Sequence, residues 1–100
     1  MKLQMHSIHF NADKKLTDFI QKRINKLETF YDRIVDGEVI MRVEKDNQNH
    51  NKTIEFKINI PGEQLFVKQK DKTFEAATDQ AIETLKRQLK KYKQKKTERK

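Results

Sequence analysis

The spacing of hydrophobic positions changes several times along this chain, and each change marks a structural element. Residues 2–7 alternate between apolar and polar side chains, which predicts a short strand with one buried face. The alternation loses its phase at Ile8, so we expect the strand to end or to bulge near Ser7. Asp13 then suits the N-cap of a helix that reaches about Tyr31. The apolar positions of that helix, spaced three or four apart, are Leu16, Phe19, Ile20, Ile24, Leu27 and Tyr31.

The middle of the chain returns to alternation, which predicts three further strands. One lies at residues 39–44, and a more regular one at residues 53–60 follows a polar loop at 46–51. The pair Pro61-Gly62 fits a type II turn, because proline presets the first central position and glycine tolerates the positive φ of the second. Alternation resumes at residues 65–67, which closes a hairpin.

A long second helix is expected from about Thr73, because apolar residues recur at helical spacing from Phe74 to Tyr92. The element order is then β-α-β-β-β-α, which predicts a two-layer α+β sandwich: a four-stranded mixed sheet with both helices on one face. The first two strands are joined through a helix and should be parallel, and the other pairs should be antiparallel. We expect a single domain over residues 1–95 and a basic C-terminal tail at 96–100.

The net charge of +8 is concentrated at the C-terminal end of the chain. Residues 86–100 hold nine bases and one acid, Glu98, whereas the preceding residues balance fourteen bases with fourteen acids. A helix dipole favours bases at a C-terminus, but its effect fades within one turn and does not account for so many. Such segregation points to a polyanionic partner.

The first helix carries a second basic feature. A projection at 100° per residue places four bases in one stripe beside the apolar face: Lys15, Lys22, Lys26 and Arg33. Arg23 falls inside the apolar stripe, where it either snorkels over the edge of the core or is held by an acid or an RNA phosphate. The acids of the second helix are explained by solubility and by the pairing of Glu83 with Arg87, which lies one turn later.

Several classes of site are excluded or unsupported. The chain has no cysteine, so disulfides and thiolate chemistry are absent. His6 and His9 would point to opposite faces of a strand, His50 sits in a polar loop, and Ser7 lacks the context of a nucleophile. We therefore expect no enzyme, no metal and no cofactor. No apolar run is long enough to cross a membrane and no signal peptide is evident, so we expect a cytoplasmic protein.

Nucleic-acid binding fits the charge best, and structured RNA is the better target. Zinc fingers, leucine zippers and the paired aromatics of RNA-recognition sheets are all missing, so sequence-specific DNA binding is not supported. The mode of binding that is left is recognition of the RNA backbone and of the shape of the RNA.

Three segments resemble the family of ribosome hibernation promoting factors, also called ribosome-associated translation inhibitors. They are Lys26–Ile34, Val43–Lys45 and Ala81–Lys93, the last reading AIETLKRQLKKYK. The resemblance covers essentially the whole chain and its element order. It implies a protein of resting bacterial cells that lies in the mRNA and tRNA channel of the small ribosomal subunit and blocks decoding.

The resemblance also implies that bases of both helices face ribosomal RNA. The matching residues are Arg23, Lys26, Lys86, Arg87, Lys90, Lys91 and Lys93, and Lys22 joins them from the charge stripe. It implies the short form of the family, which lacks a C-terminal dimerisation domain, so we expect a monomer when free.

Two alternatives stay open. A double-stranded RNA-binding domain shares the αβββα core, but its lysines lie at the start of the last helix, where this chain has Glu75 and Asp79. A protein-binding adaptor would instead place the basic segment on an acidic protein.

Overall fold

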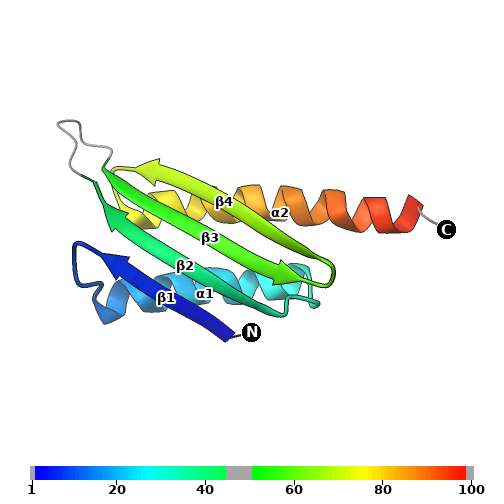
Figure 1. Cartoon of the computed structure of the whole chain (residues 1–100), viewed down its shortest axis with the longest axis horizontal. Helices are drawn as coiled ribbons and strands as arrows, with labels where there is room; N and C mark the ends of the chain where they lie inside the picture. Colours follow the sequence, from blue (N-terminus) through cyan, green and yellow to red (C-terminus); the bar gives the residue numbers. More distant parts are fainter. Residues whose placement is uncertain (1, 45–50, 99–100) are drawn as a thin grey trace.

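The computed structural model describes residues 2–44 and 51–98, with side chains up to residue 94. The elements follow in the order β-α-β-β-β-α, which confirms the sequence prediction (Figure 1). Their bounds are β1 Lys2–Ile8, α1 Lys14–Phe30, β2 Asp36–Val43, β3 Lys52–Ile60, β4 Glu63–Asp71 and α2 Phe74–Glu98.

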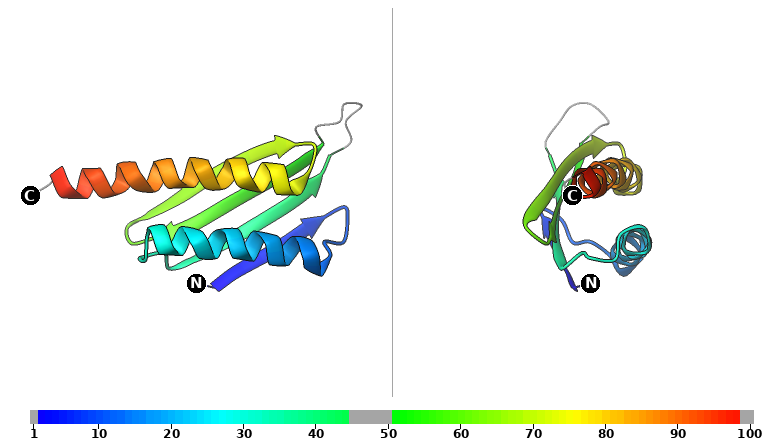
Figure 2. Two further views of the ribbon diagram at one scale, coloured as in Figure 1. Left: turned by 180° about the vertical axis from the view of Figure 1, so that it is seen from behind. Right: turned by 90° about the vertical axis from the view of Figure 1, so that its right-hand side faces the viewer.

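The strands form one sheet in the order β1-β2-β3-β4. β1 pairs with β2 in parallel, and the β2–β3 and β3–β4 pairs are antiparallel, as expected for a helix crossover followed by two direct connections. Both helices cover the same face of this sheet and run in the same direction (Figure 2). The result is the predicted two-layer α+β sandwich with a four-stranded mixed sheet.

Local chemistry sets the ends of these elements. β1 ends at Ile8, one residue beyond Ser7, and His9 follows with a left-handed φ of 69°. The Asp13 carboxylate caps α1 by accepting a hydrogen bond from the Leu16 N–H at 2.9 Å. Gly62 has a φ of 80°, as the predicted type II turn requires.

α2 begins where the sequence indicated and continues further than expected. The Thr73 hydroxyl accepts a hydrogen bond from the Ala76 N–H at 3.0 Å and so caps the helix. The backbone stays helical to Glu98, past the expected domain boundary at residue 95. The division into a domain at residues 1–95 and a tail at 96–100 remains a prediction. The last two residues of that tail lie outside the described residues, and so does most of the predicted loop at 46–51.

The hydrophobic core fills the space between the sheet and the helices. Apolar residues of β2, β3 and β4 face it from one side, including Val39, Phe56 and Val67. Ile24 of α1 and Leu89 of α2 face it from the other side, both fully buried. The opposite sheet face is mostly polar, so the outer sides of the two helices and this sheet face are the surfaces open to a partner.

Candidate nucleic-acid interface

The exposed bases of α1 and α2 lie on the helix layer, on the side away from the sheet. Because the apolar stripe of each helix packs toward the sheet, residues on the opposite side of each helix are exposed. Among the predicted site residues, the exposed ones are Lys22, Lys26, Arg87, Lys90, Lys91 and Lys93. Lys86 and Arg23 are half-buried. The fold therefore brings the two basic segments, distant in sequence, onto one layer of the molecule.

Arg23 lies in the seam between the helices. Its Nε atom is 2.9 Å from Oδ1 of Asp79 on α2, and its guanidinium carbon lies 4.7 Å from the centre of the Phe19 ring. The Nε–H does not point at the carboxylate with hydrogen-bond geometry, so the contact is an ion pair. Of the roles left open by the sequence, the structure shows Arg23 held by an acid.

Two other side chains of α2 interact differently from the sequence prediction. Glu83 forms an ion pair with Lys86 at 3.6 Å, and Arg87 donates a hydrogen bond to the Thr84 hydroxyl at 3.2 Å. The predicted pairing of Glu83 with Arg87 is therefore replaced by contacts three residues apart. Each contact is on the surface, where such pairs contribute little to stability.

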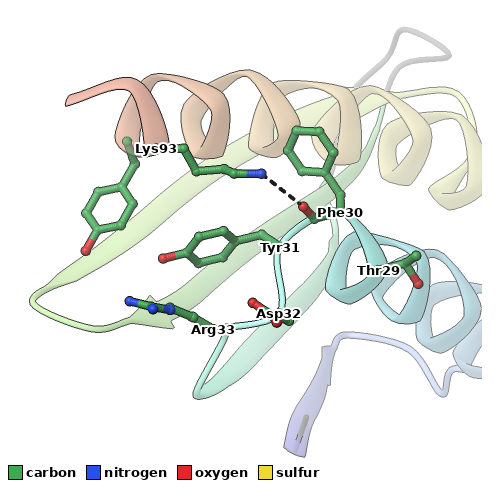
Figure 3. Close-up of a pocket in the computed structure, with 7 residues that line it drawn as sticks. Thr29, Phe30, Tyr31, Asp32, Arg33 and Lys93 are labelled. Carbon is green, nitrogen blue, oxygen red and sulfur yellow. Dashed lines mark hydrogen bonds between the residues drawn. The ribbon is translucent and has the colours of Figure 1, made fainter. Parts of the chain in front are cut away.

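Lys93 connects the end of α2 to the end of α1. Its ammonium group lies 3.5 Å from the Phe30 carbonyl oxygen and 5.0 Å from the centre of the Phe30 ring (Figure 3). The Phe30 carbonyl belongs to the last turn of α1, where a cation is favourable because helix carbonyls are unpaired there. Lys93 thus has a structural contact in addition to its predicted role in RNA binding.

Arg33 is not part of the basic stripe on α1, which corrects the helical projection. The helix ends at Phe30, and Tyr31 leaves it with an extended backbone at φ −146° and ψ 111°. Arg33 therefore lies in the turn after the helix, where its exposed side chain lines a hollow together with Tyr31 and Lys93. Lys15, Lys22 and Lys26 remain exposed on α1.

The outer sheet face carries charges of both signs, several of them in ion pairs. His6 lies 2.9 Å from Glu38, and Arg42 lies 3.5 Å from Glu55. The hydrogen bond from the Thr53 hydroxyl, more than any other contact, lowers the pKa of the Glu44 carboxyl. Paired charges give a weaker field than the exposed bases of the helix layer, so the helix layer is the better surface for a polyanion.

The described residues hold no group of three or more side chains suited to a metal ion. His6 is engaged with Glu38, and His50 lies outside the described part of the chain. Of the helices in that part, none is both long and apolar enough to cross a membrane.

Comparisons with known proteins point to one family. The family model described as Sigma 54 modulation protein / S30EA ribosomal protein matches residues 3–97. A ribosome hibernation promoting factor from Pseudomonas putida is 30% identical over 95% of this chain and 89% of its own length. The proteins of that name from Azotobacter vinelandii and Escherichia coli K12 are 31% and 28% identical.

Solved structures agree on the fold. A ribosomal subunit interface protein from Coxiella burnetii superposes with a TM-score of 0.82 over 93% of this chain and 98% of its own, at 20% sequence identity. The N-terminal domain of Protein Y from Thermus thermophilus gives a TM-score of 0.79 over 92% of this chain and 99% of its own, at 19% identity. With the family model matching nearly its whole length, this chain belongs to the Sigma 54 modulation protein / S30EA ribosomal protein family.

Proposed function

We propose that this chain is a ribosome-binding hibernation factor that occupies the mRNA and tRNA channel of the small subunit and inhibits translation in resting cells. The observation that carries the proposal is the basic outer side of the two helices in a chain whose relatives are named ribosome hibernation promoting factors. Ribosomal RNA is the polyanion that such a surface meets on a ribosome.

The proposed contacts are ionic and directed at the RNA backbone. Exposed lysines and Arg87 supply charges that can follow phosphates without reading bases. The site comprises Lys22, Arg23, Lys26, Lys86, Arg87, Lys90, Lys91 and Lys93. Within it, Arg23 and Lys93 also hold the helices together through Asp79 and Phe30, so we assign them a smaller share of the binding energy.

The shape of the molecule supports insertion into a channel. It measures 51 × 25 × 18 Å, and the C-terminal turns of α2 project beyond the sheet (Figure 2). Lys90, Lys91 and Lys93 lie on the C-terminal half of α2, where Lys93 contacts the end of α1 and Tyr92 contacts the β3–β4 turn.

The proposal includes a cytoplasmic location, a monomeric free state and no enzymatic activity. The names of the relatives describe ribosome-associated factors and no enzyme, in agreement with the absence of a catalytic motif from the sequence. The proposed action is steric: the protein fills a space that mRNA and tRNA would otherwise occupy.

Affinity for ribosomes should fall steeply with salt. If about 5–7 phosphates are neutralised, counterion release gives a slope of log affinity against log salt of about −4 to −6. Titration of labelled protein with purified ribosomes over a series of salt concentrations measures this slope. An affinity that stays flat from low to moderate salt would refute an electrostatic interface with RNA.

A further inference from the structure

A hollow of about 470 Å³ lies where α1 ends beside the C-terminal half of α2 (Figure 3). Its volume is within the range of about 300–1,000 Å³ that is usual for small-ligand sites. The residues that line it come from both helices and from the turn after α1: Thr29, Phe30, Tyr31, Asp32, Arg33, Tyr92 and Lys93.

Aromatic rings form one part of this hollow. Tyr31 and Tyr92 meet edge to face with ring centres 6.1 Å apart, and the Tyr92 hydroxyl donates a hydrogen bond of 2.6 Å to the Pro61 carbonyl. That bond ties α2 to the β3–β4 turn and fixes this wall. Phe30 is 38% exposed although it is a large apolar side chain. Tyr92 is half-buried and Tyr31 is buried, so Phe30 and Tyr92 provide the ring surface on which a nucleobase can pack.

Charged groups form the rest of the lining. Arg33 is exposed at the hollow, and Lys93 brings its ammonium group within 5.0 Å of the Phe30 ring centre and 6.0 Å of the Tyr31 ring centre. These two cations suit an anion that is attached to a flat ring. Asp32, also exposed, presents carboxylate oxygens that accept hydrogen bonds, so it suits an amino group on that ring.

We propose that this hollow receives one unstacked nucleotide of single-stranded RNA. The base packs on the aromatic wall, its phosphate lies near Arg33 and Lys93, and Asp32 accepts a hydrogen bond from an exocyclic amino group. An acidic peptide would satisfy the cations but would present no flat ring to the aromatic wall. The assignment rests on the proposed function, because it makes the hollow a base-contacting part of an RNA interface that otherwise follows the backbone.

Asp32 gives the hollow a base preference. Cytosine carries an amino group where uracil of nearly the same shape carries a carbonyl oxygen. A carboxylate beside that position accepts a hydrogen bond from the amino group of cytosine and repels the carbonyl oxygen of uracil. Oligocytidylate should therefore bind more tightly than oligouridylate, and the Asp32→Asn variant should lose most of this difference.

The intrinsic fluorescence of the chain reports directly on this hollow. The chain has two tyrosines and no tryptophan, and both tyrosines, Tyr31 and Tyr92, line it. A base that packs there should quench tyrosine emission. The test is a titration of the full chain with short single-stranded oligocytidylate, with parallel titrations of oligouridylate, a blunt RNA duplex and inorganic phosphate.

Saturable quenching by oligocytidylate, with weaker quenching by the other three probes, would support the proposal. Phe30→Ala should weaken the oligocytidylate titration about fivefold or more, and Arg33→Gln should weaken it too. Circular dichroism checks that both variants stay folded. The control variants Phe66→Ala and Lys68→Gln change the outer sheet face and should titrate like the parent.

Absence of quenching by oligocytidylate, or equal quenching by the duplex, would overturn the proposal. Ribosome binding by the same preparation separates this failure from failure of the proposed function. If the protein sediments with ribosomes and oligocytidylate does not quench, the assignment of the hollow is wrong and the ribosome interface stands.

Discussion

Replacing Lys26 and Lys90 by glutamate should weaken ribosome binding on the order of 10- to 100-fold. The two lysines are exposed, one on each helix, so each substitution turns attraction for phosphate into repulsion without changing the core. Lys93 is left unchanged because it also contacts the Phe30 carbonyl. Titration of labelled variants with ribosomes measures the loss, and inhibition of cell-free translation should fall in parallel.

A matched control lies on the other side of the molecule. Lys2→Glu combined with Lys68→Glu gives the same change in net charge on the outer face of the sheet, and both lysines are exposed. This variant should keep most of its affinity. Equal loss in both variants would mean that net charge and not the helix layer determines binding, and no loss in the first variant would refute the helix layer as the interface.

Replacing Phe56 by alanine should lower the free energy of unfolding by about 3–5 kcal/mol. Phe56 is fully buried on β3, next to Val67 on β4, and truncation leaves a cavity between the sheet and the helices. Urea denaturation followed by circular dichroism measures the change. The substitution should lower the free energy of unfolding and leave the charge of the helix layer unchanged.

Phe66→Ala provides the comparison for this variant. Phe66 lies on β4, opposite Lys57 in the register, and is 48% exposed on the outer face of the sheet. Its truncation should cost less than about 1 kcal/mol, because surface substitutions rarely cost more. Similar costs for the two phenylalanines would contradict the description of a core on only one face of the sheet.

Local patterns were sufficient to predict the elements of this fold. β3 alternates strictly because one of its faces is buried, and α2 repeats its apolar residues because one stripe of it packs on the sheet. The N-cap Asp13 and the turn at Gly62 could be identified because each depends on the chemistry of one or two residues. These features need no knowledge of distant contacts.

The features that the sequence did not predict depend on the relative placement of distant segments. The ion pair of Arg23 with Asp79 joins residues on two helices whose spacing is set by the whole sheet. A helical projection puts Arg33 on the basic stripe only if the helix continues past Phe30, and the helix ends there. The sequence does not indicate the hollow, because Tyr31 and Tyr92 have the spacing of core residues and only their meeting at the end of α1 forms a wall.

Co-sedimentation with separated ribosomal subunits tests the central proposal most directly. The protein should pellet with small subunits and with whole ribosomes and stay in the supernatant with large subunits alone. Prior loading of the small subunits with mRNA and tRNA should prevent its binding, because the same channel would be filled. Binding to large subunits alone, or undiminished binding to small subunits that already hold mRNA and tRNA, would contradict the proposed site.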